Sequence, residues 1–151
     1  RLMELAILNL PSARFRVKNT ENRTLIWDNI RKKYLPLTSE EWVRQHFVHY
    51  LVHHCGVRPQ RILLEKKVMT AMKASRFDIA VVNSDRSISL IVECKASEIS
   101  LNEDAIAQLL RYAYELKSRY LALTNGMQHF YFEWDSDTLE YHQINSAPTL
   151  V

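Results

Sequence analysis

Residues 88–95 have the sequence Ile-Ser-Leu-Ile-Val-Glu-Cys-Lys, and this stretch decides the fold prediction. Its branched apolar side chains are typical of a buried β-strand. Side chains two positions apart share one face of a strand, so Glu93 and Lys95 face one way while Val92 and Cys94 face the other. A carboxylate and an ammonium group on such an apolar strand are costly to bury without compensation. The stretch therefore predicts either an ion pair between them or a cation site with an acidic partner.

A possible acidic partner is Asp78, near the start of the preceding apolar stretch at 76–82. A polar turn at 83–87 separates the two stretches and predicts an antiparallel hairpin. In that hairpin the start of one strand lies beside the end of the next, so Asp78 and Glu93 become neighbours. Adjacent carboxylates repel unless a cation neutralises them, and oxygen ligands favour Mg²⁺ or Mn²⁺ over Zn²⁺. With Lys95 available to hold a water or stabilise a phosphate, we predict a phosphodiester-hydrolysis site.

The rest of the chain surrounds this hairpin with two helices and further strands. One helix is expected to begin at Thr38 or Ser39, where Thr38 and Glu41 have capping-box spacing, and to end at Gly56. A second helix is predicted over 102–118. Strands are predicted over 15–18, 24–27, 61–69, 120–124, 129–134 and 139–144, whereas 30–37 is expected to be irregular because it contains Pro36. This order predicts one α/β domain over 1–151 with a mixed sheet, in which 1–37 form an N-terminal extension with a hairpin.

Composition limits the possible functions. The chain has 151 residues, 47% hydrophobic and 25% charged, as expected for a folded domain. Only two glycines are present, which excludes the glycine-rich phosphate loops of nucleotide-binding proteins. Two cysteines give no disulfide framework, so a reducing, cytoplasmic setting is expected. The N-terminal residues do not resemble a signal peptide, and no apolar run is long enough for a membrane helix. A net charge of +3 neither requires nor opposes nucleic-acid binding.

The spacing of Asp78, Glu93 and Lys95 resembles the PD-(D/E)XK nuclease motif, with Phe77 in the position of the proline. Residues 38–47, 76–81, 91–96 and 124–126 are also similar to the N-terminal nuclease domain of type I restriction enzyme R subunits, and the similarity extends over about 15–132. This resemblance implies the restriction-endonuclease-like three-layer fold, an α/β fold with a central mixed sheet flanked by helices. It also implies hydrolysis of DNA phosphodiester bonds, dependent on Mg²⁺ or Mn²⁺.

The resemblance also implies roles for individual acidic residues. Asp78, Glu93 and Glu41 would bind the metal, and Lys95 would be the catalytic lysine. Glu41 has a competing interpretation, because a glutamate three residues after a helix cap is explained by capping alone. Glu40 is the alternative acidic residue on this helix.

The second helix carries a further pair with an implied role. Gln108 and Tyr112 lie four residues apart and so on one helix face. They are similar to the Gln-x-x-x-Tyr motif of RecB-like nucleases, which orients the lysine and contacts DNA. Arg76 is a third candidate for supporting the site or contacting DNA. The implied partners are nucleic acid, with DNA favoured over RNA, and either restriction-system subunits or a second copy of the chain. No membrane partner is expected.

Simpler interpretations stand beside these. Glu93 and Lys95 could form a solvent-exposed ion pair, and the domain could bind nucleic acid or a protein partner without cleaving anything. His49 and His53 have metal-ligand spacing with Cys55 nearby, but the sequence offers no third ligand, so ordinary histidines are favoured over a zinc site.

Two other groups of side chains have open interpretations. The tryptophans, Trp27, Trp42 and Trp134, are expected in the core rather than as stacking platforms. Ten basic residues could form a surface that follows phosphates, although a solvated face explains most of them equally well. They are Arg14, Arg16, Lys18, Arg31, Lys32, Lys33, Lys66, Lys67, Lys73 and Arg76.

Overall fold

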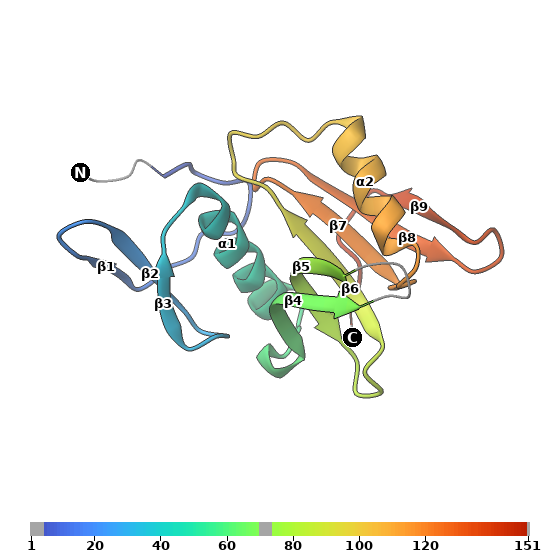
Figure 1. Cartoon of the computed structure of the whole chain (residues 1–151), viewed down its shortest axis with the longest axis horizontal. Helices are drawn as coiled ribbons and strands as arrows, with labels where there is room; N and C mark the ends of the chain where they lie inside the picture. Colours follow the sequence, from blue (N-terminus) through green and yellow to red (C-terminus); the bar gives the residue numbers. More distant parts are fainter. Residues whose placement is uncertain (1–4, 70–73, 151) are drawn as a thin grey trace.

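The computed structural model describes residues 5–69 and 74–150, which form two sheets and two α-helices (Figure 1). The small sheet contains β1 (Val17–Asn19), β2 (Thr24–Asp28) and β3 (Lys33–Pro36). The helices are α1 (Ser39–His54) and α2 (Glu103–Ala113), with a short 3-10 turn η1 (Pro59–Arg61) after α1. The large sheet contains β4 (Ile62–Met69), β5 (Ala74–Val82), β6 (Ile88–Cys94), β7 (Tyr120–Thr124), β8 (His129–Asp135) and β9 (Glu140–Ile144).

The large sheet is mixed, as predicted. Its strands lie in the order β4-β5-β6-β7-β8-β9, and only the β6–β7 pair is parallel. A parallel pair of consecutive strands needs a crossover connection, and the segment containing α2 provides it. The crossover brings the end of β6 beside the end of β7, since Cys94 pairs with Thr124. The predicted β5–β6 hairpin is confirmed.

The sheet is covered by one helix on each face, which gives the three-layer arrangement (Figure 1). Leu90, Val92 and Cys94 of β6 pack in the same core cluster as the buried face of α1. Ile91, on the opposite face of β6, packs in a second cluster with Leu109 of α2. The strand is buried on both sides, which is why its apolar sequence is nearly continuous.

Both helices begin at side-chain caps. Thr38 accepts a hydrogen bond from the backbone N–H of Glu41 at 3.0 Å, as the capping-box spacing predicts. Asn102 caps α2 by accepting from the N–H of Ala105 at 2.9 Å. The second helix is shorter than predicted, because it ends at Ala113 and residues 114–117 form turns. None of the helices in the described part of the chain has both the length and the hydropathy that crossing a membrane requires.

The prediction that 30–37 is irregular was wrong in part, because β3 forms there. The backbone N–H groups of Ile30 and Arg31 donate to Asp28 Oδ1 at 2.7 and 2.9 Å, which turns the chain back after β2. Lys32 then adopts a φ of 55° and the chain pairs with β2. Pro36 is tolerated because β3 is an edge strand of the small sheet. We call β1–β3 with the preceding residues, 14–36, the wing.

The tryptophans are not core residues, contrary to prediction. Trp27, Trp42 and Trp134 are all half-buried. Trp42 packs beside the core and donates from its indole to the carbonyl of Ala6, whereas Trp27 lies on the wing.

Candidate functional site

The site forms where β5 and β6 lie side by side. Ile79 pairs with Val92, and one step further in this antiparallel register Asp78 lies opposite Glu93. The two carboxyl groups therefore lie side by side. Burial, and then the neighbouring Asp78, raise the pKa of Glu93 to about 8. Glu93 therefore keeps its proton at neutral pH, because a second buried negative charge beside Asp78 is unfavourable without a further cation.

Hydrogen bonds from the backbone of β6 and from α2 fix the pair. The backbone N–H of Cys94 donates to Asp78 Oδ2 at 2.8 Å. The hydroxyl of Tyr112 donates to Glu93 Oε2 at 2.9 Å, and its ring stacks on Phe77 with centroids 5.5 Å apart. Burial and the nearby Glu93 raise the pKa of Tyr112, so this hydroxyl remains a donor. The structure thus connects Tyr112 of α2 to Glu93, whereas its role in orienting the lysine and contacting DNA stays a prediction.

Lys95 lies just beyond the end of β6. Its backbone N–H donates to the carbonyl of Thr124 at 2.8 Å, which continues the β6–β7 pairing by one residue. Burial and Asp78 raise the pKa values of Glu93 and Glu40, and the positive charge of Lys95 opposes both increases. Lys95 therefore lies close to the acidic groups that it was predicted to join.

The sequence did not predict that an arginine of α1 would join this site. Arg44 is 3% exposed, and its Nη2 lies 3.0 Å from Asp78 Oδ1 and 3.1 Å from Glu40 Oε2. Its Nη1 donates to Glu41. Burial disfavours the charged form, but Glu41 and Asp78 outweigh it and raise the pKa of Arg44. The signal in the sequence was the four-residue spacing from Glu40, which places both side chains on one helix face.

The two adjacent glutamates of α1 have different surroundings. Glu41 is 6% exposed, and its carboxylate is bound by Arg31, Arg44 and Gln45. Glu40 is exposed as a residue, but its carboxyl group is partly buried. This partial burial and the charge of Asp78 raise the pKa of Glu40. Glu40 thus shares the electrostatic field of Asp78, while Arg44 lies between Glu41 and Asp78.

Glu65 is a second residue that the sequence did not indicate. In β4, Leu64 pairs with Ile79 and Lys66 pairs with Phe77, so Glu65 lies opposite Asp78 in this register. It has a φ of 49°, a strained conformation for a non-glycine residue and one that is more frequent at functional sites. Its carboxylate lies 3.1 Å from Arg31 and 3.7 Å from Arg44.

Two of the predicted supporting residues do not reach the carboxyl pair. Gln108 and Arg76 are exposed, and within the described residues neither has a side-chain hydrogen bond or an ion pair. Gln108 lies one helical turn before Tyr112, so it can only contact a molecule that approaches from solvent.

Most of the chain matches a known protein family. Residues 39–148 match the model of the family described as type I restriction enzyme R protein N terminus (HSDR_N). The chain belongs to this family. A search among curated proteins finds no match. The matched segment of this R-protein N-terminal domain contains α1, the whole large sheet and α2, and therefore every residue of the site except Arg31.

The donor set of the R-protein domain suits a hard divalent cation. Asp78 and Glu93 offer only oxygen atoms, and the raised pKa of Glu93 reflects an unfavourable negative charge that a cation would relieve. No group of three or more His, Cys, Asp or Glu side chains that could hold a metal occurs within 5–69 and 74–150. A bound Mg²⁺ would therefore take its other ligands from water and phosphate, as it commonly does with one or two carboxylates. His49 and His53 stack with ring centroids 4.3 Å apart and belong to no such group.

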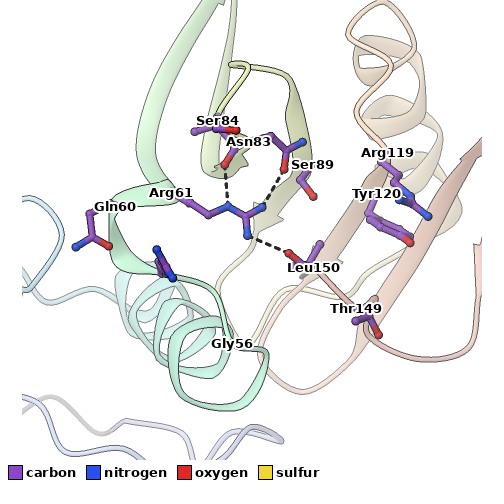
Figure 2. Close-up of a pocket in the computed structure, with 12 residues that line it drawn as sticks. Gly56, Gln60, Arg61, Asn83, Ser84, Ser89, Arg119, Tyr120, Thr149 and Leu150 are labelled. Carbon is purple, nitrogen blue, oxygen red and sulfur yellow. Dashed lines mark hydrogen bonds between the residues drawn. The ribbon is translucent and has the colours of Figure 1, made fainter.

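A separate cavity lies at the opposite end of the large sheet from the acidic site. Its volume is about 920 Å³, and Ser89, at the start of β6, is among the residues lining it (Figure 2). Arg61 points into its centre and donates to the carbonyls of Val82 and Leu150, both at 2.9 Å, and to Asn83 Oδ1 at 3.0 Å. Four residues of strand, roughly 13 Å, separate Ser89 from Glu93, so this cavity is not part of the acidic site.

Proposed function

We propose that this R-protein N-terminal domain is a metal-dependent nuclease that hydrolyses DNA phosphodiester bonds. The observation that carries the proposal is the placement of Asp78 of β5 opposite Glu93 near the end of β6, with Lys95 just beyond that end. A structural ion pair would match one acid with one base. Here Asp78 has Arg44 as its base, but Glu93 beside it forms no ion pair with the described residues, so a second negative charge is costly there unless a cation binds.

The chain's residues divide the work of the reaction. Asp78 and Glu93 would hold Mg²⁺ or Mn²⁺, which would supply positive charge to the phosphate and make the attacking water more acidic. Lys95 positions the attacking water and stabilises the charge that develops on phosphorus-bound oxygens. Water adds to phosphorus, the bond to the leaving oxygen breaks, and that oxygen takes a proton. Tyr112 orients Glu93 through its hydroxyl.

Glu40 is the acid of α1 that we place at the outer edge of the site. The resemblance implied Glu41, but Glu41 is bound by three side chains, whereas Glu40 is exposed and sensitive to Asp78. Glu40→Gln should therefore slow cleavage without unfolding the domain. Glu41→Gln should chiefly reduce stability, because it weakens the bonds to Arg31 and Arg44.

The test is cleavage of supercoiled plasmid in Mg²⁺ or Mn²⁺ buffer. Glu93→Gln and Lys95→Ala should each lower the rate at least about a hundredfold, the scale of removing a group that acts in the transition state. Glu115→Gln removes the same charge at an exposed position after α2 and should cleave like the wild type. Equal metal-dependent cleavage by the wild type and these three variants would contradict the proposal. Linear and RNA substrates in parallel show whether the enzyme is an endonuclease and whether it prefers DNA.

One observation favours a second function. Arg44 forms ion pairs with Asp78, Glu40 and Glu41, which already neutralises part of the acidic cluster. A domain that keeps this arrangement permanently would bind nucleic acid or a partner subunit without cleaving. Absence of cleavage together with absence of metal binding would identify this second function.

A further inference from the structure

The wing contains an unusual concentration of positive charge. Residues 14–36 include seven Lys and Arg and two Asp and Glu, so their formal charge is +5. The whole chain has a formal charge of +3, so all other residues together carry −2. The mild overall charge therefore hides a basic segment attached to a slightly acidic body, and this segment projects from one side of the molecule beside α1 (Figure 1).

One face of the wing holds its cations against aromatic rings. Alternation along the strands places Arg16, Lys18, Trp27 and Tyr34 on the same face, opposite the buried side chain of Ile26. The guanidinium of Arg16 lies 5.3 Å from the centre of the Trp27 ring, and the ammonium of Lys18 lies 5.3 Å from that of Tyr34. The two rings pack edge to face with centroids 5.2 Å apart.

These rings fix the cations without neutralising them. Neither Arg16 nor Lys18 forms an ion pair with any of the residues that the structure describes. A cation stacked on a ring is attracted to the ring's electrons, while its N–H groups remain available at the edge. Such groups are prepared to bind an anion, since little side-chain freedom is left to lose.

Other basic side chains of the wing line a cavity between the wing and α1. This cavity has a volume of about 320 Å³, and its lining includes Arg14 and Lys32 but no Asp or Glu. Nδ1 of His49, which also lines the cavity, is buried without a hydrogen-bond partner among the described residues. Basic groups thus lie both on the outer face of the wing and beside α1, the helix that carries Glu40.

The wing is also tied to the acidic site. Arg31 binds the buried carboxylate of Asp28 at the end of β2, and its other nitrogens reach Glu41 and Glu65 at about 3.1 Å. The chain then passes from β3 directly into the first turn of α1. The wing is therefore fixed next to the acidic site.

We infer that the wing is a nucleic-acid-binding surface that grips the phosphate backbone of duplex DNA, independently of base sequence, next to the acidic site. The choice of DNA as the anion rests on the proposed function; the charge, the stacked cations and the basic cavity do not. The phosphate contacts give affinity and position, and the acidic site acts on the strand that the wing holds.

The experiment measures binding of a fluorescent DNA duplex by anisotropy in EDTA, over a series of salt concentrations. Arg16→Gln/Lys18→Gln should weaken binding by about tenfold or more at 0.1 M salt and reduce the slope of log K against log salt by about 2. The matched control is Arg86→Gln/Arg119→Gln, which removes two exposed arginines at the other end of the sheet and should bind like the wild type. Thermal unfolding checks that both double variants fold.

An unchanged affinity and slope in Arg16→Gln/Lys18→Gln would overturn the inference, as would an equal loss in the control. So would binding to anionic lipid vesicles without binding to DNA, because the surface would then serve a membrane. Since EDTA removes divalent cations, these results do not depend on cleavage. If the wing variant loses DNA binding but the wild type never cleaves DNA, only the proposed function is refuted. If the wild type cleaves DNA but the wing variant binds DNA normally, only this inference is refuted.

Discussion

At the scale of single residues, the raised pKa of Glu93 determines how the site responds to pH. Glu93 has a raised pKa of about 8 in the folded protein, against an ordinary value of 4.5 in the unfolded chain. Below both values the group is protonated in both states and has no effect on stability. As pH rises from about 4.5 to 8, the unfolded chain loses its proton first, so the free energy of unfolding falls.

We therefore expect Glu93→Gln to be more stable than the wild type at pH 8 in EDTA, with the difference vanishing near pH 4. The substituted amide keeps an oxygen that can accept the Tyr112 hydrogen bond and has no acidic proton to lose. Urea unfolding of both proteins across this range measures the difference. A difference that is constant with pH would show that Glu93 ionises normally in the fold.

Sequence reasoning succeeded at this scale where one strand register fixed the outcome. Asp78 and Glu93 follow from the alternation of β6 and from the hairpin to β5, both of which are local. Arg44 and Glu65 could not be predicted, because they come from other elements and meet Asp78 only after α1 and β4 pack beside β5. Capping could not decide between Glu40 and Glu41, since one residue of helix rotates a side chain by about 100°.

At the scale of elements, the turn after β7 shows how packing makes one glycine necessary. Gly126 has a φ of 84°, and its carbonyl accepts from Asn9 N–H at 2.8 Å. A Cβ added there would lie 2.8 Å from Leu8 Cδ2 and 3.1 Å from Val43 Cγ2. The turn therefore packs the N-terminal segment and α1 against the end of β7. This end lies beside the end of β6, which Lys95 follows.

Gly126→Ala should lower the free energy of unfolding by about 2–4 kcal/mol, because it adds overpacking to a strained φ. Gly56→Ala is a matched control, since Gly56 has a φ of 72° but nothing within 4 Å of an added Cβ. It should lose only about 1 kcal/mol. Urea unfolding separates the two, and equal losses would mean that the contact with Leu8 and Val43 is unimportant.

The elements were predicted well where periodicity was strong and poorly where a side chain shaped the backbone. The large sheet, α1 and the turn at Gly126 follow from apolar alternation and glycine position. The strand β3 was missed because it depends on the buried Asp28, which organises the preceding turn through two backbone hydrogen bonds. The end of α2 was missed because apolar spacing continues through Leu116 after the helix has ended.

At the scale of the whole molecule, Arg31 joins the wing to the body. It is 15% exposed and binds Asp28, which is fully buried, together with Glu41 and Glu65. Burial raises the pKa of Asp28, but hydrogen bonds from Arg31 and its charge outweigh this and lower it. The stabilisation is therefore present above the unfolded pKa and is lost as pH falls through the folded value.

Arg31→Met should destabilise the protein by about 3–5 kcal/mol at pH 7, because it leaves a buried carboxylate without its cation. Asp28→Asn in the same chain should recover part of this loss, since no uncompensated charge remains. The loss should shrink as pH falls below about 4, the ordinary range of an aspartate pKa. Urea unfolding of the two single variants and the double variant tests the coupling, and strict additivity would argue that Arg31 does not hold the wing in place.

The most direct test of the whole account is binding of Mn²⁺, followed by the loss of its free electron paramagnetic resonance signal. We predict one Mn²⁺ site per wild-type chain near neutral pH, lost in Glu93→Gln and in Asp78→Asn and retained in the exposed control Glu115→Gln. Binding should also release protons below pH 8, because the metal displaces the proton that Glu93 carries there. Mn²⁺ binding that is absent from the wild type, or unchanged in Glu93→Gln and Asp78→Asn, would contradict the claim that these two residues form a catalytic metal site.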